Sequence, residues 1–315
     1  MPIGWRHSYL GVLRKSAKRR LSRSHWNHSL SVARTFELPD LPRKRRHPNE
    51  VWAIFLVKNE ADVLGHTLKH AFGQGIDRAL VVDNGSTDGT LELIDELTGR
   101  YDIIVGFDHE AAYYQSHKMT YLARWASKRG AGWVIPTDAD EFWFAESDTV
   151  GDFLRSTTND IVEAQLFNLF PTPAQPEAHG LEGTLRFDHT KHVLGKTALR
   201  GHPLAWLSMG NHFGVRPGMT GGGLFVAHVP WRSRAQYGRK VRQGAAALAS
   251  TDLEEHLGGH WRRLGDSDDA HLDENWSALL DGVPDGRDGW NPVGPFSMVR
   301  ASAWKHWPHD LWTES

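Results

Sequence analysis

The sequence predicts an α/β fold in which buried parallel strands alternate with helices. Four short apolar runs begin near residues 52, 79, 103 and 133, which corresponds to a βα repeat of about 25–30 residues. Apolar residues at helical spacing follow each of the first three runs. Right-handed crossovers between such units form a Rossmann-like sheet with helices on its faces.

The elements of this layer follow one another along the chain. Residues 52–57 (WAIFLV) and 79–82 (ALVV) are continuous apolar runs, as expected for strands buried on both faces. We expect a helix after each, the first beginning near Val63 and the second capped by Thr87 or Asp88. The third and fourth strands are expected at 103–107 and 133–136, with a helix around Leu122 between them.

The rest of the chain has a different character, which predicts four regions. A basic arm (1–50) is expected to be a poorly ordered tail, and the α/β core spans 51–170. The third region is 171–257, and its part up to about 225 is rich in Gly and Pro and is expected to form loops and hairpins. A basic helix follows, because Ser233 and Gln236 have capping-box spacing. The fourth region is a Trp-, Gly- and Asp-rich extension (258–315).

Composition and charge exclude several classes of protein. The 315 residues are 40% hydrophobic and 23% charged, which excludes wholesale disorder, and the absence of cysteine excludes disulfides and thiolate sites. No apolar run approaches the roughly 18 residues of a membrane helix, and the N-terminal segment lacks the apolar core of a signal peptide. We therefore expect a cytoplasmic protein.

The basic arm carries most of the charge asymmetry. It contains 12 Lys and Arg against 3 Asp and Glu, whereas the remaining residues contain 24 against 35. Besides forming a solvated tail, such a run can hold a protein at the inner face of an anionic membrane or bind nucleic acid. It contains no motif that reads RNA or DNA, so we expect no nucleic-acid partner.

Three polar clusters follow the expected strands, where the loops of a parallel sheet form ligand sites. They are Lys58-Asn59-Glu60, Asp83 to Asp88 and Asp138 to Glu141. Asp138 and Asp140 can face one side of an extended segment, and their repulsion favours a divalent cation beside them. The alternative is an acidic turn bonded to backbone amides.

Several common motifs are absent from the sequence. KNEADVLG stands where a dinucleotide-binding protein has Gly-x-Gly-x-x-Gly, and neither a Walker A sequence nor a Gly-x-Ser-x-Gly elbow occurs. Dinucleotide-dependent enzymes, P-loop NTPases and α/β-hydrolases are therefore disfavoured.

Residues 51–145 resemble the family 2 glycosyltransferases of the GT-A fold, especially their bacterial branch with a KNEA start. The resemblance rests on AIFLVKNEADVL, LVVDNGSTDGT and GAGWVIPTDADEFW, in this order. It implies a GT-A sheet that binds a nucleotide-diphospho-sugar, flanked by helices, with a loop-rich C-terminal half. It also implies inverting, metal-dependent transfer of a hexose, with Mn²⁺ or Mg²⁺, to a saccharide or lipid-linked acceptor.

The resemblance assigns roles to residues of the three clusters. Asn59 and Glu60 lie near the nucleotide, and Asp83 and Asn84 face base and ribose, although the second position is commonly Asp in relatives. Asp138 lies toward ribose or metal, and Asp140 is the principal metal ligand.

Later residues complete the expected site. His228 resembles a third metal ligand, Arg232 and Arg239 are placed to neutralise the diphosphate, and Lys118 resembles a donor-contacting residue. Glu141 is the candidate catalytic base, with Asp188 as an alternative. The loop at Gly210-Asn211-His212 looks like one that lines the acceptor side, and sugar-stacking or core roles are open for Trp143, Trp206 and Trp231.

Two other functions stay open at this point. The chain has the features of a catalytically silent nucleotide-sugar-binding module on the same fold. An Asp-x-Asp motif also occurs in Mg²⁺-dependent phosphotransferases, although there it usually follows the first strand and here it follows the fourth.

Overall fold

A computed structural model describes residues 6–177, 183–251, 259–284 and 291–300, and the chain divides into two units. The first unit comprises residues 1–110, 114–165 and 194–226, and the second comprises residues 111–113, 166–193 and 227–315. The boundaries therefore differ from the linear ones expected near 51, 171 and 258, because part of the Gly- and Pro-rich region returns to the sheet of the first unit.

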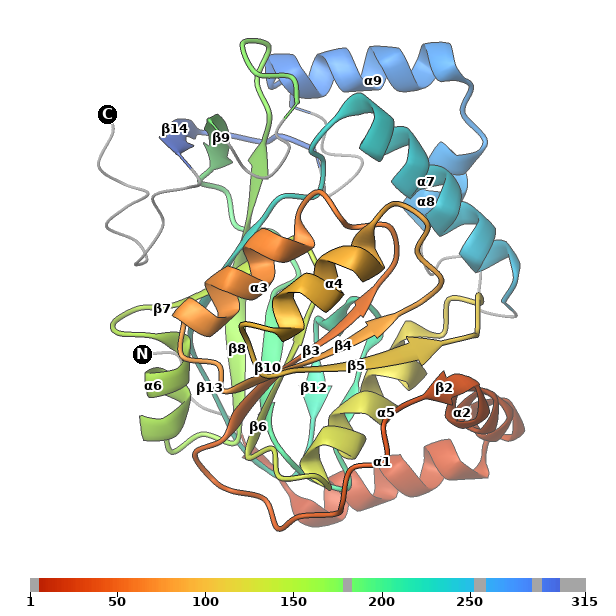
Figure 1. Ribbon diagram of the computed structural model, residues 1–315, viewed down its shortest axis with the longest axis vertical. Coiled ribbons are helices and arrows are strands. Elements are labelled where there is room, and N and C mark those ends of the chain that lie inside the picture. Colours follow the sequence, from red (N-terminus) through yellow and green to blue (C-terminus); the bar gives the residue numbers. More distant parts are fainter. Residues whose placement is uncertain (1–5, 178–182, 252–258, 285–290, 301–315) are drawn as a thin grey trace. The chain divides into compact units, whose positions relative to one another are not determined.

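The first unit contains a large mixed sheet (Figure 1), in the strand order β1-β13-β8-β10-β6-β3-β4-β5-β2. Its centre is parallel, with Phe55 level with Thr137 of β6 and Val57 level with Asp83 of β4. The predicted α/β fold class and its four parallel strands are confirmed. These strands are β3 (Val51–Val57), β4 (Arg78–Asp83), β5 (Ile103–Asp108) and β6 (Trp133–Thr137).

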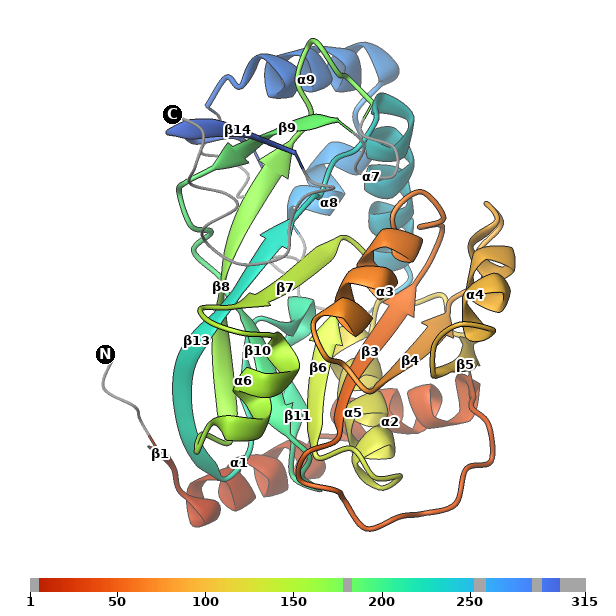
Figure 2. The ribbon, with the colours of Figure 1, turned by 60° about the vertical axis from the view of Figure 1, so that its left-hand side comes forward.

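Helices cover both faces of this parallel centre. Trp52, Ile54, Leu80 and Val82 pack with Met119 and its neighbours in α5 (Gln115–Ser127). Figures 1 and 2 show α3 (Leu64–Gly73) and α4 (Thr90–Thr98) over the opposite face. The three helices expected between the strands are confirmed. Gly89 (φ 93°) occupies the N-cap position of α4, and the Asp88 carboxylate accepts the backbone N–H of Thr90 at 3.1 Å.

Several strands that the sequence analysis did not assign extend the first unit. β10 (Lys196–Arg200) pairs antiparallel with β6 on one side and with β8 (Ile161–Phe170) on the other. β7 (Glu141–Ala145) begins directly after the Asp-x-Asp segment. The remaining elements of this unit are α6 (Val150–Ser156), β11 (Trp206–Leu207), the 3₁₀ turn η2 (Met209–Asn211), β12 (Gly214–Val215) and the first part of β13 (Gly218–His228).

The N-terminal arm is not the tail that its charge predicted. It forms β1 (Arg6–His7), α1 (Tyr9–Leu21), α2 (Arg23–Thr35) and β2 (Phe36–Glu37), and β2 pairs antiparallel with β5. Val12 and Val32 are buried, and the Ser22 hydroxyl accepts a hydrogen bond from the backbone N–H of His25 to cap α2. Apolar residues at helical spacing therefore give these helices an inner face despite their charge.

The second unit has a small sheet and three helices. β9 (Thr184–Asp188) pairs with β14 (Phe296–Arg300) and with the end of β8. Trp231, Tyr237 and Trp276 form part of an apolar cluster shared by the helices. Ser233 caps the predicted helix, which is thereby confirmed. The helices are α7 (Arg234–Ala249), α8 (Gly259–Gly265) and α9 (Asp269–Asp281).

No helix in the described part of the chain is both long enough and apolar enough to cross a bilayer.

Candidate functional site at the ends of the parallel strands

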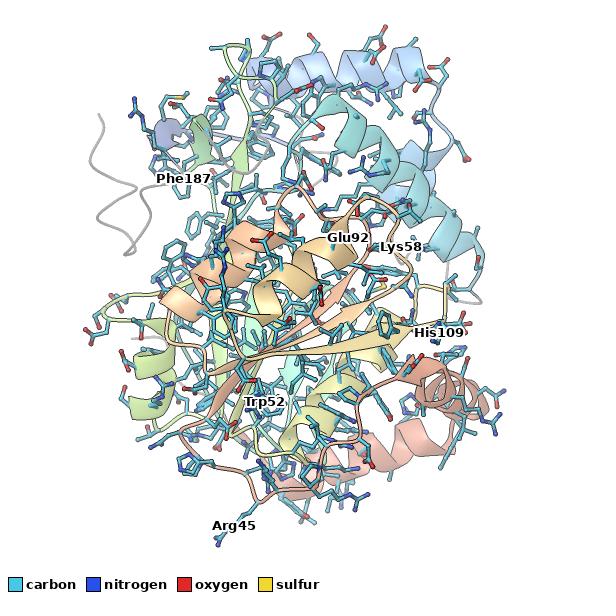
Figure 3. The ribbon with its side chains drawn as sticks, viewed as in Figure 1. Arg45, Trp52, Lys58, Glu92, His109 and Phe187 are labelled. Carbon is cyan, nitrogen blue, oxygen red and sulfur yellow. The ribbon has the colours of Figure 1, made fainter. Side chains whose placement is uncertain are left out.

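The three polar clusters of the first unit lie at one edge of its sheet. β3, β4 and β6 are parallel neighbours, so their carboxyl ends meet at this edge. Lys58, which directly follows β3, lies at the opposite end of this strand from Trp52 (Figure 3).

Asn59 fastens two of the loops to each other. It is buried in the left-handed region (φ 56°), a conformation that Asn tolerates better than most residues. Its Oδ1 accepts a hydrogen bond from the backbone N–H of Thr87 at 2.7 Å, and its own N–H donates to Ser86 Oγ at 2.8 Å. The backbone N–H of Glu60 donates to Thr90 Oγ1 at 3.0 Å. Asn59 and Glu60 therefore join the β3 and β4 loops.

Asp83 has one carboxylate oxygen committed to its own loop and one without a partner. Oδ2 accepts hydrogen bonds from the N–H groups of Gly85 and Ser86, at 2.9 and 3.0 Å. Oδ1 is buried and receives no hydrogen bond from the described residues. Because a buried acceptor without a donor is costly, Asp83 Oδ1 is suited to accept an N–H or O–H of a ligand.

Asn84 and Lys118 are both turned toward Asp108, which ends β5. The Asn84 amide donates to the backbone oxygens of Asp108 and Glu110 and, at 3.0 Å, to Asp108 Oδ2. Lys118 Nζ lies 2.6 Å from Asp108 Oδ2, and both side chains are buried. Burial lowers the pKa of Lys118, and the Asp108 carboxylate opposes that effect. Both residues therefore brace the β5 end, whereas the sequence analysis expected them to contact the donor.

The Asp-x-Asp segment contains an ion-pair cluster that the sequence analysis missed. Lys196 Nζ lies 2.7 Å from Asp138 Oδ2 and also contacts Glu141 Oε1. Burial alone would lower the pKa of Lys196, but the two carboxylates raise it. Burial likewise acts to raise the pKa of Asp138, but the Lys196 ammonium outweighs it and holds that pKa low.

Glu141 is poorly placed for the role of base that was expected of it. Its side chain has no exposed surface, its carboxylate contacts Lys196, and it accepts the backbone N–H of Asp138 at 3.2 Å. Burial raises its pKa well above the ordinary value. In this arrangement Glu141 organises the turn between Asp138 and Glu141. Asp188 does not replace it, because that buried carboxylate accepts three backbone N–H groups of the second unit.

Asp138 and Asp140 differ in their surroundings. Asp138 Oδ1 accepts from Asn211 Nδ2 at 3.2 Å and contacts Gln115 Nε2 at 3.5 Å, so both of its oxygens have protein donors. Its side chain is nevertheless 32% exposed, whereas Asp140 is only 2% exposed. Asp138 is thus already neutralised by Lys196, and of the two, Asp140 is the better candidate for a metal ligand.

The second unit contains the metal-ligand and diphosphate-binding candidates of the C-terminal half. His228 Nδ1 lies 2.9 Å from Asn168 Oδ1, and in the tautomer that donates this hydrogen bond the lone pair is on Nε2, as a metal ligand requires. Arg232 is fully buried and donates from Nη1 to Val229 O, and Arg239 is partly exposed on α7. Trp231 is a core residue of this unit.

A divalent metal fits only some of the predicted ligands. Within the described ranges no group of three or more His, Asp or Glu side chains is arranged to hold a metal ion. Asp140 and His228 have suitable donor chemistry, and Asp138 does not, because its two oxygens are taken by an ammonium and two amides. Trp143 is buried in the first unit and Trp206 is partly buried in β11.

Three residues that shape this site were not found from the sequence. Lys196, Gln115 and Asp108 belong to no motif. Lys196 and Gln115 each contact a residue far along the chain, and Asp108 pairs with Lys118 of the helix that follows it. The sequence offers no local signal for Lys196, because KTALR contains two basic residues and resembles an exposed segment.

Comparison with solved structures finds distant similarity to glycosyltransferases. A mannosyltransferase from Pyrobaculum calidifontis, in complex with GDP-Man and Mn²⁺, is 15% identical with a TM-score of 0.39, over 86% of this chain and 84% of that one. TarS 1–349 of S. aureus, in complex with UDP, is 14% identical with a TM-score of 0.37, over 72% of each chain. Similarity at this level assigns no activity to the chain.

Comparison with curated proteins and with family models adds a match that covers the candidate site. No curated protein matches the chain. A family model, however, matches residues 52–151, from β3 into α6, and therefore covers Asn59, Asp83, Asp138 and Asp140. The segment that carries the three strand-end clusters thus matches the family described as glycosyl transferase family 2.

Proposed function

We propose that this protein is a glycosyltransferase that moves a hexosyl group from a nucleoside-diphosphate donor to an acceptor hydroxyl with inversion. The observation that carries the proposal is Asp83, whose buried Oδ1 has no donor at the edge where Asp138 also emerges. Both carboxylates belong to the segment that matches glycosyl transferase family 2. A carboxylate in this place can accept an N–H of a nucleobase or a hydroxyl of ribose.

The chemistry asked of the site is a single displacement at the anomeric carbon. The acceptor oxygen forms the new bond, the bond to the diphosphate breaks with its electron pair on the diphosphate, and a base takes the acceptor proton. Basic side chains are needed where negative charge develops, and Arg239, partly exposed on α7, is our candidate. Glu141 is not retained as the base, because Lys196 holds its carboxylate.

A divalent metal is part of the proposal, with Asp140 of the first unit as its candidate ligand. When bound, such an ion acts as a Lewis acid that stabilises the charge on the departing diphosphate. Asp140 supplies a buried carboxylate, and His228, the other ligand that the resemblance implied, lies in the second unit beside Asn168. Asp138 is assigned to the donor and not to the metal.

The proposed partners are a nucleotide-sugar and a saccharide or lipid-linked acceptor, the latter at the cytoplasmic face of a membrane. Two features of the first unit support the membrane contact. Residues 1–36 contain no acidic residue, and α1 exposes Arg14, Lys15 and Lys18. Large apolar side chains on the same helix pair are exposed as well, Leu10 by 68% and Trp26 by 50%. Basic helices with such residues bind anionic lipid surfaces.

A thermal-shift panel of UDP, GDP, CDP and their sugar conjugates, with and without Mn²⁺, tests the donor site. A ligand at about 100 times its Kd stabilises the folded protein by roughly 2.7 kcal/mol, which raises Tm by several degrees at roughly 2–4 °C per kcal/mol. One nucleotide should produce this shift in the wild type and not in Asp83→Asn, because the amide lacks the charge of the carboxylate. Chromatography of the products then distinguishes transfer and donor hydrolysis from binding alone. Binding with neither reaction would identify a silent sugar-nucleotide-binding module, and no shift with any nucleotide would refute the proposal.

A further inference from the structure

Lys196 carries a buried ammonium that contacts three oxygen atoms. Its residue is 2% exposed, and Nζ contacts Asp138 Oδ2, Glu141 Oε1 and the backbone oxygen of Gly210. Nζ donates hydrogen bonds to Asp138 Oδ2 and to the Gly210 oxygen, and it forms an ion pair with the Glu141 carboxylate. The side chain is therefore fixed in one position inside the first unit.

The three acceptors come from separate segments of the chain. Asp138 and Glu141 flank the turn between β6 and β7, and Gly210 lies in η2. Gly210 has a left-handed backbone (φ 70°), and its N–H donates to Gln115 Oε1 at 2.6 Å. Lys196 thus holds the Asp-x-Asp turn and the η2 loop together, and Gln115 ties the same loop to α5.

We call the contacts of Lys196 with Asp138, Glu141 and Gly210 the Lys196 clamp. It fixes the position of Asp138 but leaves part of that side chain accessible to solvent. One oxygen accepts from Lys196 and the other from Asn211 and Gln115, while a third of the side chain remains exposed. A carboxylate that is already neutralised by an ammonium has less to offer a divalent cation. Its exposed part retains lone pairs for a neutral hydroxyl, because a carboxylate has about four acceptor sites.

We propose that Lys196 is a positioning residue of the transfer site. It supplies the positive charge that Asp138 would otherwise take from a metal, and it holds that carboxylate and the η2 loop in the geometry that receives the hydroxyl groups of the donor. This inference rests on the proposed function. Asp138, the first carboxylate of the Asp-x-Asp motif, is therefore paired with a cation that the chain itself supplies.

A pair of variants separates positioning from stability. Lys196→Met alone leaves two carboxylates facing each other and is expected to impair folding. The informative comparison is therefore Lys196→Met/Glu141→Gln against Glu141→Gln, because the double variant removes one charge of each sign. Lys69→Met is the matched surface control, because Lys69 is exposed on α3. Circular dichroism and urea unfolding establish which variants are folded.

Three measurements are made on each folded variant. They are the Kd for UDP and GDP, the steady-state constants kcat and KM with the donor identified by the panel, and Mn²⁺ binding by electron paramagnetic resonance. The double variant should lose roughly 100-fold in kcat/KM relative to Glu141→Gln, which is the cost of a misplacement of about 1 Å at a reacting site. Its Mn²⁺ affinity should stay within about threefold. Equal kcat/KM in the two variants, or a loss of Mn²⁺ binding that matches the loss of activity, would overturn the inference.

Hydrogen exchange tests the clamp independently of any donor. Peptides that cover residues 208–213 should exchange faster in the double variant than in Glu141→Gln, because the Gly210 carbonyl loses its ammonium partner. Unchanged exchange would show that Lys196 does not hold the loop and would refute the positioning role, even for a wild type that binds no nucleotide. Failure of the nucleotide panel in the wild type refutes the proposed function, so the two failures are distinguishable.

Discussion

Lys118 Nζ lies 2.6 Å from Asp108 Oδ2, and the two buried side chains form an ion pair beneath the loop that follows β5. The same carboxylate accepts a hydrogen bond from the Asn84 amide. The β4 and β5 ends are therefore joined through Asp108, and an aspartate at position 84 would bring a second negative charge to that point.

Removal of one partner of this pair should be strongly destabilising. Lys118→Met leaves the Asp108 carboxylate buried without its cation, and we expect it to lower the free energy of unfolding by about 3–5 kcal/mol. Urea denaturation at pH 7.5 measures this change. Lys118→Met/Asp108→Asn should recover part of the loss, and a double variant that is less stable than the single one would contradict this account.

His70 should make stability fall in mild acid. Burial lowers its pKa from 6.5 to about 4, although the hydrogen bond to Trp143 O acts to raise it. The unfolded chain therefore binds a proton that the folded one does not between about pH 6.5 and pH 4, so stability falls as pH falls through this window and levels off below it. Across the whole window, this shift in the pKa of one group lowers the free energy of unfolding by about 3 kcal/mol.

Urea unfolding between pH 4 and pH 7.5 measures this contribution. His70→Gln should unfold with a smaller pH dependence than the wild type over this range. His66→Gln is the matched control, because His66 lies one turn away on α3 and is exposed. Identical pH dependence in wild type and His70→Gln would show that His70 does not couple to unfolding.

The two carboxylates of the Asp-x-Asp motif should respond differently to substitution. Asp140→Asn should weaken Mn²⁺ binding at least tenfold, whereas Asp138→Asn should leave it within about threefold, because Asp138 is already paired with Lys196. Isothermal titration with Mn²⁺ in the presence of the bound nucleoside diphosphate makes the comparison. A larger loss in Asp138→Asn than in Asp140→Asn would reverse our assignment.

Membrane contact through α1 and α2 should depend on both charge and apolar side chains. Co-sedimentation with vesicles of phosphatidylglycerol and phosphatidylcholine should retain the protein, and pure phosphatidylcholine should not. Leu10→Ser/Trp26→Ser should reduce binding, since both residues are exposed on these helices. Val293→Ser, an exposed site in the second unit, is the control. Equal binding to both lipids, or binding of RNA instead, would exclude a specific anionic-membrane role.

The parallel centre of the sheet was predictable, because β3, β4 and β6 are continuous apolar runs with polar residues directly after them. β10 was not, since its five residues include Lys196 and Arg200 and resemble an exposed loop. A lysine is buried there only because Asp138 and Glu141 meet it from another part of the chain. An ion pair between residues so far apart in the sequence leaves no local sequence pattern from which it could be predicted.

The candidate site was likewise predictable only in part from the sequence. Asp83 was found because it follows a buried strand, and the structure adds the feature that matters, an oxygen without a donor. Asn84 was expected to face the nucleotide, but its amide donors are used by the β5 end, which only the sheet order places beside it. In the arm, the many basic residues concealed the inner faces of α1 and α2, on which Val12 and Val32 are buried.

The insertion of β10 between β6 and β8 also sets an order of events during synthesis. Lys196 is 58 residues beyond Asp138, which a ribosome covers in about 3–12 s at roughly 5–20 residues per second. During this interval the β6 edge lacks the β10 strand, and the carboxylates at 138 and 141 have no cation. The segment that matches glycosyl transferase family 2 ends before β10 and so remains an incomplete folding unit until the later strand reaches it.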